Sequence, residues 1–488
     1  MWTMGKRNSL NRIIKLLTKA FLPVFIIFGL ILLSCEKKSS ETAGENQILE
    51  YWLTTGDRSA LLQKVTQPFV FDKLTSDLPL IEVDTGQKFQ SIDGFGYTFT
   101  GGSALLLHQK LDQSKRKELL NELFSTENGG IGVSYLRLSI GASDLDAHTF
   151  SYNDLQSGET DPSLTNFSLD EDRKHLIPIL KEILAINPEL KVMSSPWSAP
   201  AWMKTNNSPK GGSLKYEYYS TYADYLVRYV QEMSKEGIAI DAITIQNEPE
   251  NPNNNPSMLM TAQEQAAFIK MHLGPAFARE KIKTKIVIFD HNCDHPEYPI
   301  SILNDADAKK YIDGSAFHLY LGDISALSLV RNAHPDRNIY FTEQWTSSEG
   351  KFDGDLRWHV RNLIVGATRN WSRTVLEWNL AADPQQNPHT DNGGCTKCLG
   401  ALTIGDSVIR NVSYYIVAHA SKFVRPGSVR IASTLSDNIP NVGFITPEGR
   451  RVLIVLNDSE EDKQFVISFD GRHTSVSLMA SSVGTFVW

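Results

Sequence analysis

Residues 242–249 read AITIQNEP, a short β-rich run that leads directly into a glutamate and a proline. Similar β-rich runs recur along the chain, and amphipathic helical patterns such as 171–186 and 261–281 separate them. A regular alternation of strands and helices is typical of parallel α/β folds, and eight strands in this alternation predict a closed (β/α)8 TIM barrel. The expected strands are 94–99, 133–138, 190–194, 242–246, 285–289, 314–318, 338–342 and 373–376.

The segments on either side of this alternation predict a second domain. After residue 408 the chain consists of short β-rich runs separated by Asn, Pro, Gly and Asp, which is typical of an all-β sandwich. The strand-like segment 80–89 lies just before the barrel and can complete that sandwich from the N-terminal side. We therefore expect a side β-sandwich domain built from both chain ends, with N-terminal strands over 50–90, the barrel over 91–407 and C-terminal strands over 408–488.

The first 35 residues have the pattern of an export signal. Basic residues between positions 6 and 19 precede an apolar run over 20–33, and Ser34 and Cys35 follow. The end of this run, LLSC, resembles the bacterial lipobox, in which the cysteine receives diacylglycerol and becomes the new N-terminus. A transmembrane anchor is the alternative, but the apolar stretch is shorter than the roughly 20 residues that a span needs.

This pattern predicts where the protein resides. We expect 1–35 to be a lipoprotein signal peptide with Cys35 lipidated, and the polar segment 36–49 to be a flexible tether. The mature protein would then be exported and membrane-anchored, facing the periplasm or the cell surface. The lipid on Cys35 would attach it to the membrane.

The overall composition is that of a globular protein without a polyanionic partner. The chain has 488 residues, 41% of them hydrophobic, and a formal net charge of −8. This balance argues against nucleic acid as a partner. The histidines are scattered, and no HxH or HExxH pattern occurs, so we expect no metal and no cofactor.

Three cysteines follow the signal region: Cys293, Cys395 and Cys398. In an oxidising compartment the CTKC pair at 395–398 could close a small disulfide loop. A reduced pair is the main alternative. A redox or metal centre is a weaker one, because no thioredoxin-like unit surrounds the pair and no second ligand pair has the spacing of a zinc site.

Two glutamates follow expected strands at the mouth of the barrel. Glu248 comes after the fourth strand and Glu343 directly after the seventh, and barrel active sites gather at the carboxyl ends of the strands. Glycoside hydrolysis requires two carboxylates that face one sugar ring. These strands lie across the mouth from each other, so the side chains can approach within about 5 Å, the separation of retaining enzymes.

Other residues near the strand ends fit a sugar-binding pocket. Aromatic side chains there can stack on the apolar faces of sugar rings. Arg137 ends the second strand and Asp144 follows in the next loop; the two could form a structural pair, or could bind hydroxyl groups and tune a carboxylate. The remaining candidates are Trp197 and Trp202 after the third strand, His318 and Tyr320 after the sixth, and Trp378 after the eighth.

Six motifs occur in order along the chain: FQSIDGFG at 89–96, SPWSAPAWMKTN at 195–206, NEP at 247–249, HLY at 318–320, FTE at 341–343 and WNLA at 378–381. Together they resemble glycoside hydrolase family 30, the family of lysosomal glucosylceramidase and microbial endo-β-1,6-glucanases, from about residue 81 to the C-terminus. The resemblance implies a retaining β-glycoside hydrolase with Glu248 as acid/base and Glu343 as nucleophile.

The resemblance also implies roles for the surrounding residues. The glycone in the −1 subsite would be held by Asp144, Trp197, Asn247 and Trp378. The carboxylates would be positioned by Arg137, His318 and Tyr320. Because the acid/base must start protonated and the nucleophile ionised, we expect Arg137 to lower the pKa of Glu343, and the charge on Glu343 to raise that of Glu248.

Two departures from the glucosylceramidase pattern bear on the substrate. The first barrel loop reads TFTGG at 98–102, where glucosylceramidases have an acidic residue, and the loop 388–398 looks more like the β-glucanase branch. We therefore favour a β-glucan or gluco-oligosaccharide, with β-1,6 linkage first. The alternatives are a β-xylan or β-fucoside specificity, and a non-catalytic carbohydrate-binding surface lipoprotein, which would not need both glutamates.

Overall fold

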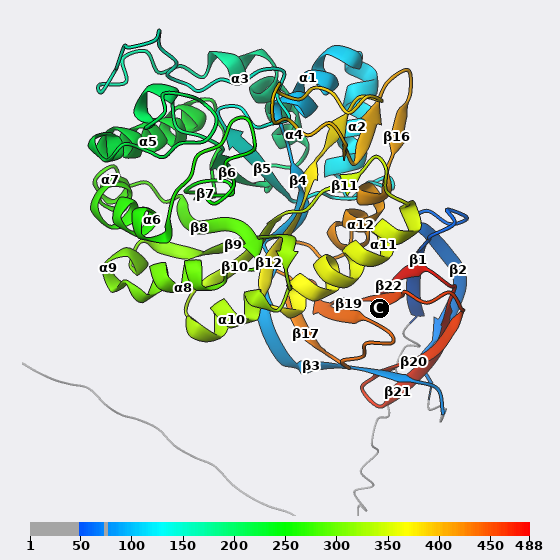
Figure 1. Ribbon diagram of the computed structural model, residues 1–488. Coiled ribbons are helices and arrows are strands. Elements are labelled where there is room, and N and C mark those ends of the chain that lie inside the picture. Colours follow the sequence, from blue (N-terminus) through cyan, green and yellow to red (C-terminus); the bar gives the residue numbers. More distant parts are fainter. Residues whose placement is uncertain (1–47, 73–76) are drawn as a thin grey trace, which may run out of the picture. The chain divides into compact units, whose positions relative to one another are not determined.

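The computed structural model describes residues 48–72 and 77–488, and Figure 1 shows how their helices and strands are arranged. The expected signal peptide with Cys35, and nearly all of the expected tether, lie outside these residues. In the described part of the chain, no helix combines the length and the apolar composition needed to cross a membrane. The described residues belong to one compact unit, which contains a barrel and a β-sandwich.

Eight parallel strands close into a barrel, which confirms the predicted fold. Neighbouring strands follow one another in chain order, and β12 pairs with β4 to close the circle. The carboxyl ends of all eight strands therefore meet at one mouth. The strands are β4 (Gly94–Thr98), β5 (Tyr135–Ile140), β6 (Lys191–Pro196), β7 (Ala242–Thr244), β8 (Lys285–Cys293), β9 (Ile312–Gly322), β10 (Asn338–Glu343) and β12 (Ser372–Asn379).

Local sequence signals set the starts of several connecting helices. At α6 the Thr261 hydroxyl accepts a bond from the Glu264 N–H at 3.3 Å, and the Glu264 carboxylate accepts one from the Thr261 N–H at 2.7 Å. At α2 the Asp112 carboxylate accepts a bond from the Lys115 N–H at 2.9 Å. The helices are α1 (Gly101–Lys110), α2 (Gln113–Phe124), α3 (Asp170–Lys174), α4 (Leu176–Ile186), α5 (Tyr219–Lys235), α6 (Ala262–Phe268), α7 (Gly274–Arg279), α8 (Glu297–Asn304), α9 (Ala306–Lys309), α10 (Ala326–Ala333), α11 (Phe352–His359) and α12 (Val412–Ser421).

Short irregular segments complete the barrel domain. Two 3-10 turns, η1 (Ala201–Met203) and η2 (Tyr216–Tyr218), lie in the connection from β6 to α5. Two π-helical segments, η3 (Ile269–Leu273) and η4 (Val360–Ala367), extend α6 and α11. The loops after β10 and β12 contribute β11 (Thr346–Ser347), β13 (Ala381–Ala382), β14 (Cys398–Leu399), β15 (Leu402–Ile404) and β16 (Val408–Arg410).

The floor of the barrel is a layer of buried side chains, one from each of seven strands. Side chains alternate between the two sides of a strand, so the residues two positions nearer the carboxyl end also point into the barrel. The floor therefore supports a second inward layer, which lies beneath the mouth. The floor consists of Tyr135, Met193, Ala242, Val287, Ala316, Tyr340 and Leu376.

The second domain takes strands from both chain ends, as predicted. In the described residues it is a nine-stranded sheet in the order β2-β1-β22-β19-β18-β17-β3-β20-β21. The N-terminal strand β3 lies between two C-terminal strands, antiparallel to β17 and parallel to β20. The strands are β1 (Ile48–Thr55), β2 (Gln63–Val70), β3 (Leu80–Ser91), β17 (Val429–Ser433), β18 (Asn441–Ile445), β19 (Arg451–Asn457), β20 (Lys463–Phe469), β21 (Arg472–Leu478) and β22 (Ser482–Val487).

Helix α12 moves the domain boundary from its expected position. It begins at Val412, after the expected end of the barrel at 407, and packs against β4, where Tyr97 donates a hydrogen bond to the Ser413 carbonyl at 3.1 Å. All of its residues are buried, so its sequence has no polar face and no amphipathic period. By these contacts α12 belongs with the barrel, and the C-terminal sandwich strands begin at Val429.

Candidate active site

The candidate site rests on the inward layer above the barrel floor. Its members are mostly polar, although the layer beneath them is largely apolar. Arg137, Ser195, Thr244, His318 and Thr342 each lie two positions beyond a floor residue of their own strand. All five are buried, so each of their polar groups needs a partner inside the protein.

All five side chains share one hydrogen-bond partner, Asp290, which was not predicted from the sequence. Its carboxylate accepts hydrogen bonds from five side chains on five different strands. If side chains alternated regularly along β8 from the floor residue Val287, Phe289 would point into the barrel and Asp290 away from it. However, the register shifts between Phe289 and His291, and both Phe289 and Asp290 have positive φ angles of 73° and 62°. This bulge turns the carboxylate into the barrel.

Glu248 and Glu343 lie above this layer and face each other. Glu343 is the last residue of β10, while Glu248 follows β7 and is held by a bond from its N–H to the Asp290 carbonyl at 3.0 Å. Both side chains are buried. One oxygen of each carboxylate and one ring nitrogen of His318 all lie within 4.8 Å of one another. This separation matches that of retaining glycosidases, about 5 Å.

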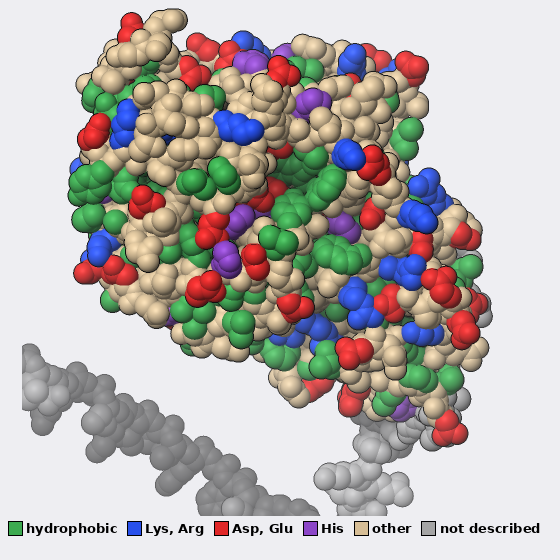
Figure 2. Space-filling view, viewed as in Figure 1, with side chains coloured by type: hydrophobic (Ala, Val, Ile, Leu, Met, Phe, Trp, Pro, Cys, Tyr) green, Lys and Arg blue, Asp and Glu red, His purple; other side chains and the backbone are tan. Residues whose placement is uncertain are grey.

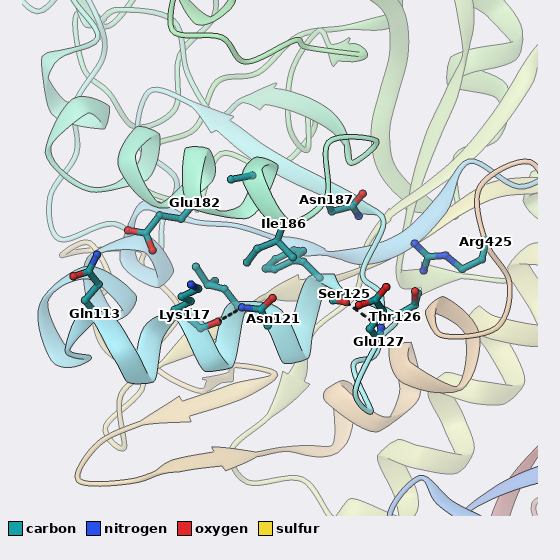
Figure 3. Close-up of a pocket in the computed structure, with 13 residues that line it drawn as sticks. Gln113, Lys117, Asn121, Ser125, Thr126, Glu127, Glu182, Ile186, Asn187 and Arg425 are labelled. Atoms are coloured by element: carbon teal, nitrogen blue, oxygen red, sulfur yellow. Dashed lines mark hydrogen bonds between the residues drawn. The ribbon is translucent and has the colours of Figure 1, made fainter.

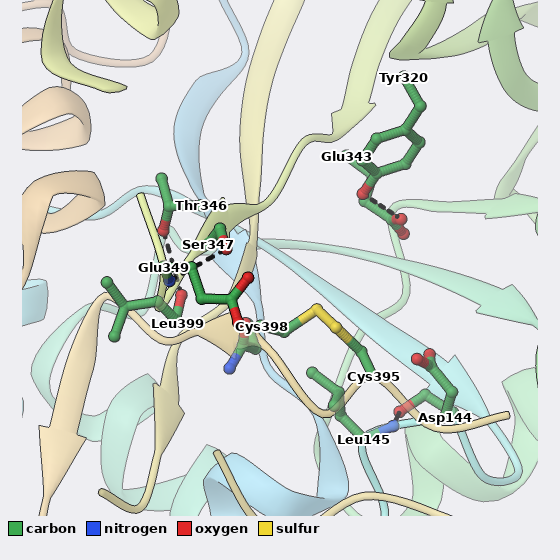
Figure 4. Close-up of a disulfide and its surroundings, with 12 residues drawn as sticks. Asp144, Leu145, Tyr320, Glu343, Thr346, Ser347, Glu349, Cys395, Cys398 and Leu399 are labelled. Carbon is green, nitrogen blue, oxygen red and sulfur yellow. Dashed lines mark hydrogen bonds between the residues drawn. A yellow bond between two sulfur atoms is a disulfide. The ribbon is translucent and has the colours of Figure 1, made fainter. Parts of the chain in front are cut away.

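The Glu343 carboxylate is fixed through both oxygens. Arg137 donates to Oε2 at 2.6 Å. The Tyr320 hydroxyl donates to Oε1 at 2.9 Å, and Figure 4 shows these two side chains facing each other. Burial raises the pKa of Glu343 above its usual value, and the opposing charges of His318 and Arg137 do not overcome that effect. The carboxylate therefore has one orientation and little contact with solvent.

Glu248 has a different set of partners. Asn251 and Asn254 donate to its Oε2 at 2.7 and 3.1 Å, and His318 Nδ1 lies 3.2 Å from its Oε1. The other nitrogen of His318 lies 3.1 Å from Asp290 Oδ1. These carboxylate partners raise the pKa of His318, which favours an imidazolium whose two nitrogens both donate.

The protonation pattern corrects the expectation for these two glutamates. Burial acts to raise the pKa of Glu248, but the hydrogen bond and charge of His318 bring it down to about 2. Burial acts to lower the pKa of His318, but the charge of Glu343 and the bonds to Asp290 and Glu248 raise it to about 9. The predicted rise in the pKa of Glu248 is therefore wrong for the free protein, because the hydrogen bond and charge of His318 outweigh burial.

The structure brings together all four residues expected to bind the glycone. Trp197 and Trp378 stack with ring centroids 5.5 Å apart. The Trp197 indole N–H is buried and has no partner among the described residues. Burial, with the charges of Glu343 and Glu248, raises the pKa of Asp144 to about 8.

Two expectations for individual residues are corrected. Arg137 pairs with Asp290 and Glu343, at 2.7 and 2.6 Å, rather than with Asp144. Its guanidinium also donates to Asn247 Oδ1 at 2.7 Å and lies over the Trp197 ring. The second correction is Trp202. Its indole N–H donates to Asn153 and its ring packs against Tyr218, so it belongs to the core rather than to the site.

The cysteine pair forms a disulfide at the edge of this site. Cys395 and Cys398 are bonded, with their Cα atoms 5.7 Å apart. Cys398 packs with Leu145, Trp197 and Trp378 in one apolar cluster. Cys293 is buried and free.

One group of described residues, Glu248, His318 and Glu343, has the spacing of a metal site. Its chemistry does not fit one. An imidazolium has no lone pair for a metal, and Arg137 already balances the charge of Glu343. These three side chains are therefore a poor donor set for a metal ion.

A surface groove in the described part of the chain does not share these features. A groove of about 750 Å³ lies along α2 and beside the C-terminal end of α4 (Figure 3). Leu120, Phe124 and Ile186 line it, but no pair of facing carboxylates does. Figure 2 shows acidic and basic side chains interspersed on one face of the molecule, without a patch of one sign.

Comparison with known proteins gives the same architecture. Residues 92–424 match the Glycosyl hydrolase family 30 TIM-barrel domain, and residues 427–486 match the Glycosyl hydrolase family 30 beta sandwich domain. The endo-1,6-beta-D-glucanase neg1 of Aspergillus fumigatus is 33% identical over 441 residues, which cover 85% of this chain and 88% of that protein.

Two further relatives extend the comparison. The lysosomal acid glucosylceramidase of Mus musculus is 29% identical over 439 residues, 84% of this chain and 83% of that protein. The solved structure of the endo-beta1,6-glucanase BT3312 has a TM-score of 0.82 at 33% identity, and covers 90% of this chain and 99% of its own. Both domains, in the same order and over nearly the whole described chain, show that this protein belongs to glycoside hydrolase family 30, whose members are retaining β-glycosidases.

Proposed function

We propose that this enzyme hydrolyses β-1,6-linked glucan by double displacement, with Glu343 as nucleophile and Glu248 as acid/base. The observation that carries the proposal is the pair of buried carboxylates whose oxygens lie within 4.8 Å. The linkage rests on relatives named endo-1,6-β-glucanases that are 33% identical to the chain.

The different partners of the two glutamates support this assignment of roles. Glu343 is fixed through both oxygens by Arg137 and Tyr320, which suits an atom that must attack the anomeric carbon from one direction. Glu248 has a protonated histidine beside it at 3.2 Å. A carboxylate next to a titratable donor suits repeated proton transfer.

The first step needs a proton on Glu248. A shift of one proton along the His318–Glu248 hydrogen bond converts the imidazolium–carboxylate pair into a neutral imidazole and a carboxylic acid. Exclusion of water by a bound sugar favours this neutral pair, because desolvation penalises charged groups. Glu248 then protonates the leaving oxygen while Glu343 attacks, and the glycosidic bond breaks as the glycosyl–enzyme bond forms.

The second step reverses these roles. The Glu248 carboxylate takes a proton from water, the water oxygen attacks the anomeric carbon, and Glu343 leaves as a carboxylate. Two inversions give a product of retained β configuration. Glu248 is left protonated, and the return of this proton to His318 restores the starting imidazolium–carboxylate pair.

The sugar ring would lie against the stacked indoles of Trp197 and Trp378. The unpartnered Trp197 N–H is a donor for a hydroxyl group. Asp144 is a carboxylic acid at neutral pH because of its raised pKa. It can therefore donate a hydrogen bond to the sugar without adding a third negative charge beside the glutamates.

A substrate panel tests the function. The purified protein would be incubated in parallel with pustulan (a β-1,6-glucan), xylan and an aryl β-glucoside. We expect new reducing ends from pustulan and none from xylan, with Glu343→Gln inactive as the control. Release from xylan alone would overturn the linkage, and binding of pustulan without hydrolysis would overturn the enzymatic function.

A further inference from the structure

Residues 388–399, here named the strap, follow β13, cross the mouth of the barrel and end with β14. The strap contacts four other loops of the mouth. In the loop after β5, the Asp144 carbonyl accepts a hydrogen bond from the Thr390 N–H of the strap at 2.9 Å. In the loop after β7, the Asn255 side chain donates to the Asp391 carbonyl of the strap at 2.6 Å. Lys210, after β6, donates to the Asn392 carbonyl. The Ser348 N–H, after β10, donates to the Lys397 carbonyl at 2.9 Å.

The strap also lies directly against the expected sugar-binding residues. Cys398 packs with Trp197, Trp378 and Leu145, and Cys395 packs at the edge of the same cluster. Figure 4 shows Cys395 beside Asp144. A backbone hydrogen bond from Cys395 acts on the Asp144 carboxylate and opposes the rise of its pKa.

The approach of the strap to Asp144 is close enough to require glycine. A Cβ atom at Gly394 would lie 2.8 Å from the Asp144 carbonyl oxygen and 2.3 Å from that of Thr390. A real Cβ does not tolerate such contacts, so position 394 is fitted to the loop that carries Asp144. The position of Asp144 thus depends on the position of the strap.

The disulfide ties Cys395 to Cys398, which is itself held by strand pairing. Cys398 is held by pairing of β14 with β11, where Ser347 is opposite Cys398. Cys398 is buried, whereas Cys395 is half-buried and Thr396 and Lys397 are exposed, so a small thiol can reach the bond. If the bond is broken, the two sulfur atoms must separate to ordinary contact distance. Cys395 is the freer of the two to move, because Cys398 is buried and lies in a paired strand.

We propose that the strap positions Asp144 and the paired indoles for the glycone, and that breaking the Cys395–Cys398 bond weakens sugar binding while the catalytic carboxylates stay in place. The inference rests on the proposed function of this site in binding a sugar. An external dithiol supplies two electrons and two protons, the disulfide becomes two thiols, and the dithiol closes to its own disulfide.

The experiment compares oxidised and dithiothreitol-reduced wild type, with alkylation and mass spectrometry to count free thiols. Tryptophan fluorescence titration with gentiobiose, a β-1,6-linked glucose disaccharide, reads binding near Trp197 and Trp378 without needing turnover. We expect Kd to rise about five- to tenfold on reduction, the effect of one displaced hydrogen-bonding partner, and to return on reoxidation. In turnover of an aryl β-glucoside, KM should rise similarly while kcat changes less than about twofold.

Two variants serve as controls. The double variant Cys395→Ser/Cys398→Ser should bind gentiobiose with the Kd of the reduced wild type, and dithiothreitol should not change that Kd. Thr396→Ala, between the cysteines and exposed, should behave like wild type in both states. An unchanged Kd after the bond is shown to be broken would overturn the proposal, and so would a loss of kcat with unchanged KM, the result of a purely structural bond. Absence of turnover in the oxidised wild type would instead reject the proposed function, while the titration still decides the role of the strap.

Discussion

At Asp290, one buried carboxylate joins five strands of the barrel. It accepts bonds from Arg137 at 2.7 Å and from His318 at 3.1 Å, and these two side chains in turn contact Glu343 and Glu248. Asp290 is therefore a positioning residue, since it acts through its neighbours. Both catalytic candidates depend on the same buried charge for the orientation of their partners.

Replacement of this charge tests that role. In Asp290→Asn, Arg137 loses a charged partner and His318 loses one of its two carboxylates, so both lose their fixed geometry. We expect kcat/KM to fall about 100-fold, the cost of a small displacement at a reacting centre. The pKa of His318 should fall as well, so the alkaline limb of the pH–rate profile should move to lower pH.

A matched variant separates this effect from general disruption. Ser195→Ala removes a neutral donor to Asp290 at 3.0 Å and should cost much less activity, with no shift of the alkaline limb. Circular dichroism would confirm that both variants fold. An Asp290→Asn enzyme with an unmoved pH profile would contradict the account.

The two glutamates could be predicted from the sequence, whereas Asp290 could not, and each outcome has a physical reason. Glu248 and Glu343 follow strands, and strand ends in a barrel meet at one mouth. Asp290 points inward only because of the bulge at Phe289, which reverses the alternation on which such reasoning depends. The protonation pattern could not be predicted either, because it depends on the three-dimensional position of His318.

At the scale of elements, α12 joins the barrel to the β-sandwich. Its His419 lies between two hydroxyl groups of that domain, Thr485 and Thr54, each 2.8 Å from one ring nitrogen. Each expected barrel strand overlaps an observed one, since β-rich runs between helices are distinctive. Helix α12 was not predicted, because a helix buried on all sides has no periodic pattern.

The buried His419 makes stability depend on pH. Burial lowers its pKa to about 3 in the folded protein, against about 6.5 in an unfolded chain. Between these values only the unfolded chain binds the proton, so the free energy of unfolding falls as pH decreases, by about 1.4 kcal/mol per unit below 6.5. His419→Gln does not titrate there. Its Tm should fall less than that of wild type between pH 7 and pH 5, and equal decreases would contradict this assignment.

At the scale of the whole molecule, the first described strands pair within the C-terminal sheet, so both ends of the described chain lie in one domain. The described chain begins with β1, which pairs with the last strand, β22. We propose that the segment before it anchors the protein through lipid on Cys35, as its LLSC sequence indicates. The exported location would also favour the disulfide of the strap.

The anchor is tested in bacterial cells that process lipoproteins. Cys35→Ser removes the acceptor for diacylglycerol, so the variant should accumulate unprocessed or appear in the soluble fraction. Wild type should enter the detergent phase after Triton X-114 separation. Ser34→Ala keeps the cysteine and a small residue before it, and should behave like wild type. Normal processing and detergent partitioning of Cys35→Ser would reject the anchor.

The central claim is that Glu343 is the nucleophile and Glu248 the acid/base of a retaining enzyme, and the configuration of azide products tests it most directly. With an aryl β-glucoside that has a good leaving group, Glu248→Ala should still form the glycosyl–enzyme, and azide, which needs no base, should release a β-glycosyl azide. Glu343→Ala lacks the nucleophile, so azide should attack the substrate directly and give the α-glycosyl azide. Nuclear magnetic resonance of the two products decides the assignment. An α-azide from Glu248→Ala together with a β-azide from Glu343→Ala would show that the roles are exchanged.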